Sequence, residues 1–201
     1  VDYPLREPED IQKLRAPWHE IDQEATTLDA ARLAEVIGDL ITINVDRGPA
    51  YRMWTGDIST DLGYLRGIEH FMLDMYDRPE MVHAAMSFLT EGHRRLVQQY
   101  VALNLLSLNN DGTYHSSGGV GYTDELPAPG FDPARVRPCD MWASAESQEM
   151  AQVSPAMHKE FVLQYEKELL APFGLTGYGC CEDLTRKLDA VLTIPHIRRI
   201  S

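Results

Sequence analysis

The sequence has 201 residues, of which 44% are hydrophobic and 24% charged, as is typical of a soluble globular domain with a sizeable core. Its formal net charge is −13 and no basic stripe is visible, so we expect neither nucleic acid nor a membrane as a partner. Its three cysteines do not form a secreted disulfide framework, which favours a cytoplasmic protein. The chain starts at Val1 and stops within a predicted strand, so we expect it to be part of a longer protein.

The first third of the chain mixes irregular segments with short elements. Residues 1–27 are rich in proline and charge, and we predict an irregular segment with one helical turn opened by Pro8. A helix is predicted over residues 28–38. Alternating and β-branched residues then predict strands at Leu40–Val45 and Tyr51–Trp54.

Two amphipathic helices are predicted next. Ser59 or Thr60 is expected to cap the first, whose apolar stripe runs over residues 62–75. Pro79 begins the second and longest helix. His93 falls on its apolar stripe, which favours a packed histidine over a functional one.

The second half of the chain alternates strands with helices and contains a long loop over residues 113–138. Strands are predicted at Leu105–Leu108, at Asp140–Ser144, from Leu175, and at the C-terminus. This order predicts an α/β fold with a mostly parallel sheet. Neither a Gly-x-Gly-x-x-Gly nor a P-loop pattern occurs at a strand-to-helix turn, which favours part of a (β/α)8 TIM-type barrel over an open, doubly wound sheet.

The strongest candidate for chemistry lies where the strand from Leu175 runs out into a loop. Cys180 and Cys181 are adjacent there, and Glu182 follows them. A thiolate is both a nucleophile and a soft metal ligand, although a cysteine can also pack as a small hydrophobe. No further Cys or His stands at short spacing, so the local pattern does not complete a zinc site.

Polar residues after other strand ends are weaker candidates. Asn110, Asp111 and His115 could bind a metal, a sugar or a carboxylate, but they are also ordinary turn formers. Glu146 could bind substrate or simply mark entry into a helix. The Tyr64 phenol could donate to an anionic substrate or pack. Three pairs of basic residues are interpreted as solvated: Arg94-Arg95, Arg186-Lys187 and Arg198-Arg199.

Four segments together resemble the uroporphyrinogen decarboxylase superfamily, from about residue 35 onward. They are Gly56–Gly67, Met75–Glu80, Val153–Phe161 and Gly179–Asp183. The resemblance implies a (β/α)8 barrel with its site at the C-terminal ends of the strands. It also implies that this chain is a middle portion of that barrel, without its first and last strands.

Within that superfamily, the cysteines favour the zinc-dependent methyltransferases, which move a methyl group between a corrinoid and a thiol. The resemblance implies zinc held by Cys181, with Cys180 beside it, and a corrinoid carried by a partner protein. Glu182 and Asp111 would orient the substrate. The sequence departs from the family motif because Gly179 occupies the position of its histidine.

Two alternatives stay open. The first is a metal-free decarboxylase of a carboxylated tetrapyrrole, in which Tyr64 contacts the substrate. In either enzyme, Asn110, His115 and Glu146 are expected to bind a small-molecule substrate. The second alternative is a catalytically inactive fragment or binding module, whose exposed strand edges would favour association with a partner or a second copy.

Overall fold

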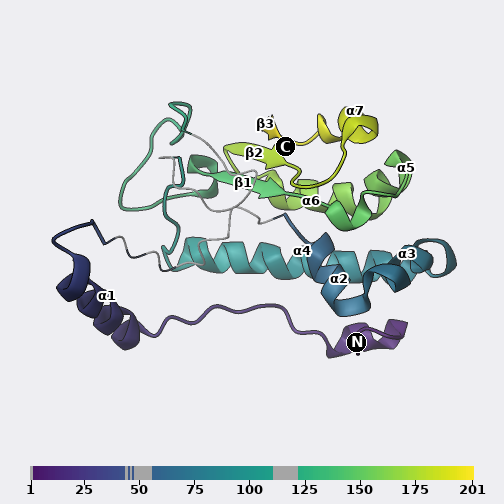
Figure 1. Cartoon of the computed structure of the whole chain (residues 1–201), viewed down its shortest axis with the longest axis horizontal. Helices are drawn as coiled ribbons and strands as arrows, with labels where there is room; N and C mark the ends of the chain where they lie inside the picture. The colour runs from purple at the N-terminus through teal and green to yellow at the C-terminus, as the bar shows by residue number, and fades with distance from the viewer. Residues whose placement is uncertain (1, 44, 46, 48–55, 111–121) are drawn as a thin grey trace.

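The structure is a computed structural model, and it describes residues 2–43, 45, 47, 56–110 and 122–201. It is a mixed α/β structure built in layers (Figure 1). A three-stranded sheet packs on helix α6 (Gln164–Leu170), and the long helix α4 (Pro79–Ala102) lies beneath α6. The N-terminal segment runs along the far side of α4, opposite the sheet (Figure 1).

The sheet consists of parallel strands in chain order. Strand β1 covers Trp142–Ala145, β2 covers Leu175–Tyr178 and β3 covers Ile197–Ile200, with β2 in the middle. Helical segments connect them, as parallel pairing requires. The predicted parallel sheet is therefore confirmed, and the described strands form an open sheet.

The two faces of the sheet differ in what covers them. The helical face carries Ala143, Ala145 and Tyr178, which pack against side chains of the connecting helices. The loop face carries Trp142 and Leu175, which pack with a leucine from the loop of residues 122–137. Because side chains alternate along a strand, Ser144 and Gly177 also lie on the loop face.

Three helices build the larger part of the core below the sheet. Helices α2 (Ser59–Arg66), α3 (Ile68–Asp77) and α4 enclose a cluster of buried leucine, methionine and phenylalanine side chains. One continuous helix was expected over the stripe of residues 62–75, but Gly67 divides it. Gly67 has a φ of +85°, and the ring of Tyr3 occupies the space where a side chain would be.

The crossover from β1 to β2 begins at Ser154, whose side chain accepts a hydrogen bond from the Met157 N–H, as the sequence predicts for an N-cap. The crossover runs through α5 (Pro155–His158), the π-helical turn η5 (Lys159–Leu163) and α6. Helix α7 (Leu188–Val191) belongs to the crossover from β2 to β3. The 3-10 turns are η1 (Pro8–Lys13), η3 (Pro138–Asp140), η4 (Gln148–Met150) and η6 (Thr185–Lys187).

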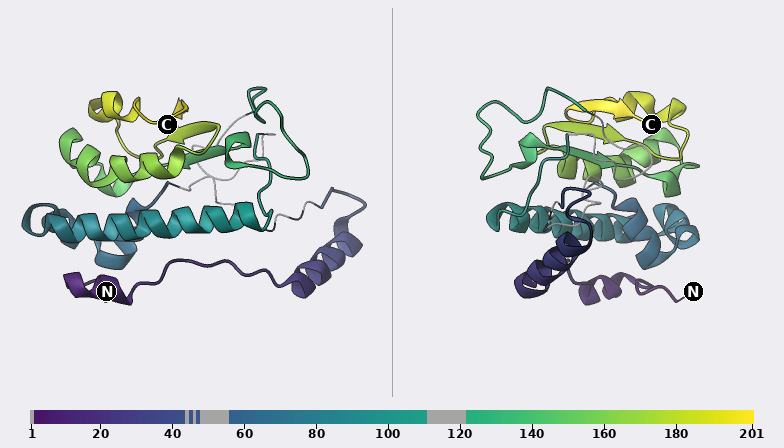
Figure 2. Two further views of the ribbon diagram at one scale, coloured as in Figure 1. Left: turned by 180° about the vertical axis from the view of Figure 1, so that it is seen from behind. Right: turned by 60° about the vertical axis from the view of Figure 1, so that its left-hand side comes forward.

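Helix α1 (Gln23–Ile37) starts five residues before the predicted helix, because Asp22 caps it through a hydrogen bond to Ala25 N. None of its residues is buried. It projects away from the layers in both views of Figure 2. The amphipathic pattern of this segment therefore does not identify a buried face within this chain.

Two predicted strands are wrong. The described residues of Leu40–Val45 are irregular, and the exposed Leu40 and Ile41 make no sheet there. Leu105–Leu108 is irregular as well, because the Leu105 N–H bonds to Tyr100 O and closes the end of α4. The predicted strand Tyr51–Trp54 lies outside the described residues. In the described part of the chain, no helix is both long and apolar enough to cross a membrane.

Candidate functional site

Carboxylates gather at the carboxyl end of β1, around Glu146. The Gly56 N–H donates to Ser144 O at 3.2 Å, which brings the start of α2 beside this strand. The Ser59 hydroxyl is bonded to Glu146 O at 3.2 Å and to Glu149 Oε2 at 3.0 Å. Ser59 thus joins α2 to the strand end rather than capping the helix as predicted, and Ile58 occupies the cap position.

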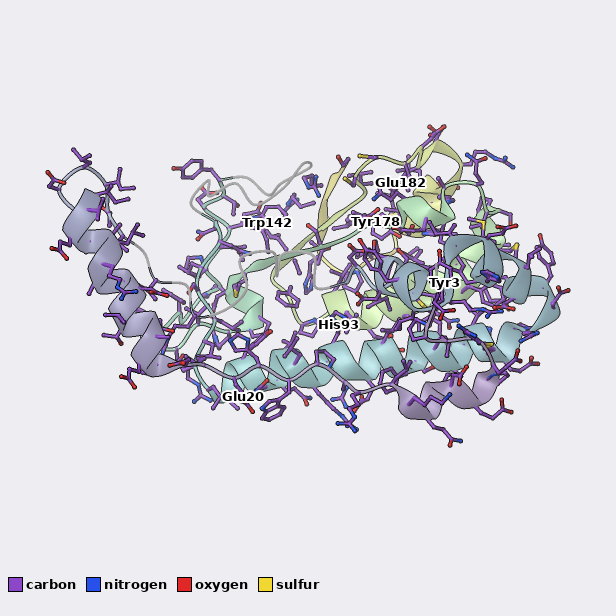
Figure 3. All side chains as sticks on the ribbon, turned by 60° about the horizontal axis from the view of Figure 1, so that its bottom comes forward. Tyr3, Glu20, His93, Trp142, Tyr178 and Glu182 are labelled. Atoms are coloured by element: carbon purple, nitrogen blue, oxygen red, sulfur yellow. The ribbon has the colours of Figure 1, made fainter. Side chains whose placement is uncertain are left out.

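Glu182 connects the ends of β1 and β2. Its two carboxylate oxygens accept backbone N–H groups from Ser147 and Cys180, each at 3.1 Å. Figure 3 shows Glu182 and Tyr178 at the same end of the sheet. The structure therefore brings together four residues singled out in the sequence: Glu146, Glu182, Cys180 and Cys181.

The carboxylates affect one another's protonation. Burial raises the pKa of Glu146 to about 8, and the negative charges of Asp57, Glu149 and Glu182 add to this effect. Burial likewise raises the pKa of Asp57 to about 6. Glu146 accepts a hydrogen bond from Gln148 N at 2.7 Å through one of its oxygens. Glu146 therefore keeps its proton at neutral pH.

A buried polar network supports this edge from the helical face. The Tyr178 hydroxyl donates to Glu166 Oε2 at 2.7 Å, and it lies 2.9 Å from Ser147 Oγ and 2.8 Å from His158 Nε2. Burial raises the pKa of Glu166 and Tyr178 well above their usual values and lowers that of His158 to about 4. Burial thus disfavours the charged form of each of these groups, and their hydrogen bonds fix the segment that follows β1.

The π-helical turn lets one helix supply two members of this network. His158 precedes the turn and Glu166 follows it, eight positions later. In a regular α-helix that spacing would place their side chains about 80° apart. A π turn absorbs one extra residue, so the spacing behaves like seven residues and the two side chains point within about 20° of each other. Both consequently reach Tyr178.

A cavity of about 340 Å³ adjoins the carboxylate edge and is lined partly by Cys181, Glu182, Arg186 and Lys187. Lys187 is only 3% exposed and donates to Met150 O at 2.6 Å, and burial lowers its pKa. The prediction of a solvated Arg186-Lys187 pair is therefore wrong for Lys187, which faces the interior. The cavity combines a thiol with two basic groups and with the carboxylates of Glu182 and Asp183, so it offers partners to both charges of a polar ligand.

The two thiols do not assemble a zinc site with the described residues. Cys180 Sγ and Cys181 Sγ lie 3.4 Å apart. The neighbouring Cys180, together with the charges of Glu146 and Glu182, raises the pKa of Cys181, which opposes thiolate formation. Among the described residues, no three His, Cys, Asp or Glu side chains come together in a way that could hold a metal ion. The set does not fit the three or four ligands that zinc takes.

Tyr64 lies elsewhere. Its side chain is 76% exposed and lines a separate groove of about 420 Å³ between the N-terminal segment and α4. His93 lines the same groove and bonds to Asp61 at 2.7 Å through its Nε2 atom, so it has a structural partner, consistent with a packed role. The Tyr64 groove shares no described lining residue with the cavity at Cys181.

Of the three candidate residues at the start of the long loop, the structure describes only Asn110. Asn110 donates its side-chain amide to Leu126 O at 2.8 Å, so it holds the loop that covers the sheet. Asp111 and His115, predicted for catalysis and substrate binding, lie outside the described residues.

The sequence did not point to three residues that lie near Glu146 and Glu182 at the carboxyl ends of the strands. Asp57 and Glu149 join Glu146 only through the folding of distant segments, and Lys187 had been assigned to the surface. One signal could have found Asp57, because it follows the predicted strand Tyr51–Trp54 as Glu146 follows Asp140–Ser144. Searches of protein families, curated proteins and solved structures found no match for this chain.

Proposed function

We propose that this chain carries the proton-transfer site of a small-molecule enzyme and that its reaction is a decarboxylation of the uroporphyrinogen decarboxylase type. The observation that carries the proposal is Glu146, a carboxyl group that stays protonated at neutral pH at the carboxyl end of parallel strands. Perturbed acids at such an edge are characteristic of general acid catalysts.

The arrangement of the sheet supports a place in a (β/α)8 barrel. Strands β1, β2 and β3 are parallel and adjacent in chain order. The described helices that pack on them, α6 and α7, do so on the helical face. In a barrel of this kind the loop face would line the interior, and the carboxyl ends of the strands would carry the site.

Decarboxylation needs a proton donor after carbon dioxide has left. The bond between the substrate carbon and its carboxylate breaks, and the electron pair stays on the carbon. Glu146 then gives its proton to that carbon, a C–H bond forms, and the resulting Glu146 carboxylate takes a new proton from water. Glu182 would hold the backbone after β1 and β2 in place, and the buried Lys187 would orient the acidic substrate beside Glu146.

The test is carbon dioxide release from uroporphyrinogen by the wild-type chain, by Glu146→Gln and by the control Glu168→Gln. Glu168 is an exposed glutamate on α6, away from the edge. We expect turnover to fall at least 100-fold in Glu146→Gln and to stay within about twofold in the control. Turnover in wild type and Glu146→Gln at equal rates, or none in either, would overturn the proposal.

The corrinoid-linked methyltransferase remains a second candidate on one observation, the adjacent thiols of Cys180 and Cys181 at the end of β2. It needs further zinc ligands from outside the described residues. Elemental analysis of the purified chain beside Cys181→Ser decides it, because stoichiometric zinc that disappears on substitution would favour this candidate. A chain with neither metal nor turnover would point to the binding module.

A further inference from the structure

The loop face of the sheet holds hydrogen-bond donors that have no acceptor. Ser144 Oγ, Trp142 Nε1 and two guanidinium nitrogens of Arg199, Nε and Nη2, are buried, and none has a hydrogen-bond partner within the described structure. Buried polar groups are nearly always paired, because losing water without replacement costs free energy. A concentration of unpaired donors on one face therefore points to an acceptor that comes from elsewhere.

Three of these donors converge on one point above Gly177. The register places Gly177 between Ser144 on β1 and Arg199 on β3. A Cβ atom built on Gly177 would lie 2.8 Å from Ser144 Oγ, 2.9 Å from Arg199 Nε and 3.0 Å from Arg199 Nη2. The hydroxyl and the guanidinium group therefore meet over Gly177, in the space that a side chain there would fill.

Arg199 differs in this respect from its neighbour. Arg198 is exposed and forms an ion pair with Glu125, as expected for a solvated residue. The sequence-based prediction that both arginines are solvated is therefore wrong for Arg199. A partly buried guanidinium group that forms no ion pair with a described carboxylate is costly, and a carboxylate or phosphate group is the acceptor that matches its geometry.

We propose that Ser144, Gly177 and Arg199 form an anion cradle that binds an oxyanion, a carboxylate or phosphate group, of a ligand. Arg199 Nε and Nη2 donate to the anion as a pair and Ser144 Oγ adds a third donor, while Gly177 lets both side chains lie close over the backbone of β2. The cradle lies two residues before Glu146 along β1. The cradle would bind the substrate of the proposed function. This part of the inference rests on that proposal, because it assumes that the molecule held in the cradle is the one that Glu146 protonates.

Binding can be measured without any turnover. Thermal unfolding is followed with succinate or with inorganic phosphate at constant ionic strength, against sodium chloride. For the wild-type chain we expect a rise in Tm of about 5–10 °C at 100 times the Kd. Arg199→Gln should weaken binding at least 100-fold and Ser144→Ala about 10-fold. Arg198→Gln is the matched control and should bind as the wild type does.

The stability of the same variants without ligand separates the cradle from a structural role. Ser144→Ala and Arg199→Gln remove unpaired polar atoms, so we expect both to be at least as stable as the wild type in the absence of anions. A loss of stability in both would mean that these groups have partners inside the protein, and it would overturn the proposal. So would a Tm shift that is equal in all variants.

The cradle and the proposed function can fail independently. Glu146→Gln should keep anion binding while it loses turnover. Binding by the wild type without turnover would retain the cradle and refute the decarboxylase. Turnover without binding of either probe would refute the cradle and retain the decarboxylase. A clear preference for succinate or for phosphate would identify which oxyanion the ligand carries.

Discussion

Substituting Glu146 by glutamine should change how the stability of the protein depends on pH. The pKa of Glu146 in the folded protein is about 8, against a usual value of 4.5, because of burial and nearby negative charge. Below about pH 4.5 the group is protonated in both the folded and the unfolded chain. As the pH rises from there to about 8, only the unfolded chain loses the proton, so stability falls and this contribution is lost above pH 8.

The size of the effect follows from the shift. Moving a pKa from 4.5 to about 8 corresponds to an upper bound of about 5 kcal/mol. We expect at least about 3 kcal/mol, because a carboxyl group that still holds its proton at pH 7 must have a pKa of at least about 7 in the folded protein. Glutamine keeps an oxygen that can accept the Gln148 N–H but cannot ionise.

The assay is urea unfolding of wild type and Glu146→Gln between pH 5 and 9. The difference in unfolding free energy should be below about 1 kcal/mol at pH 5 and should reach at least about 3 kcal/mol in favour of Glu146→Gln at pH 9. Glu168→Gln controls for the loss of a carboxyl group at an exposed position. The difference in unfolding free energy between this variant and the wild type should vary little with pH. A difference for Glu146→Gln that does not change with pH would show that this carboxyl group ionises normally, and it would remove the main support for a proton donor.

Three further substitutions test how the edge and the core are held. Asp74→Asn breaks the ion pair between Asp74, which is 6% exposed, and Arg66, which is 11% exposed. It should lower the unfolding free energy measured with urea by about 3–5 kcal/mol, and a decrease below about 1 kcal/mol would contradict a buried pair. Asn109→Ala removes two hydrogen bonds to the backbone of Trp142 and should cost about 2 kcal/mol; an unchanged urea midpoint would contradict this anchoring of β1. Tyr178→Phe leaves a buried glutamate without its donor and should cost about 1–3 kcal/mol; a more stable variant would contradict the network.

The sequence correctly predicted where helices begin when a single residue or turn determines the start. Pro79 starts α4 and Ser154 caps α5, and both follow from the chemistry of a single turn. Leu40–Val45 shows the limit of such signals. Its β-branched residues suit a strand, but a strand exists only where another strand pairs with it, and that depends on the whole fold.

The site residues also differ in whether the local sequence could identify them. Glu146 and Glu182 were predictable because each follows a strand, and the carboxyl ends of parallel strands meet at one edge. Arg199 was not, because the alternation that turns it inward and Arg198 outward depends on knowing the register with Gly177. Its unpaired state depends further on the missing side chain of that glycine, a three-dimensional coincidence that no short pattern in the sequence contains.

The π-helical turn has a consequence for the evolution of this chain. An extra residue at Lys159–Leu163 leaves the side chains on either side in the phase of a regular helix, so it has the character of a single-residue insertion. With the extra residue in place, His158 and Glu166 both contact Tyr178. In homologous chains we expect a one-residue gap at this turn to occur together with all three of those side chains, because a regular helix shorter by one residue presents them in the same way.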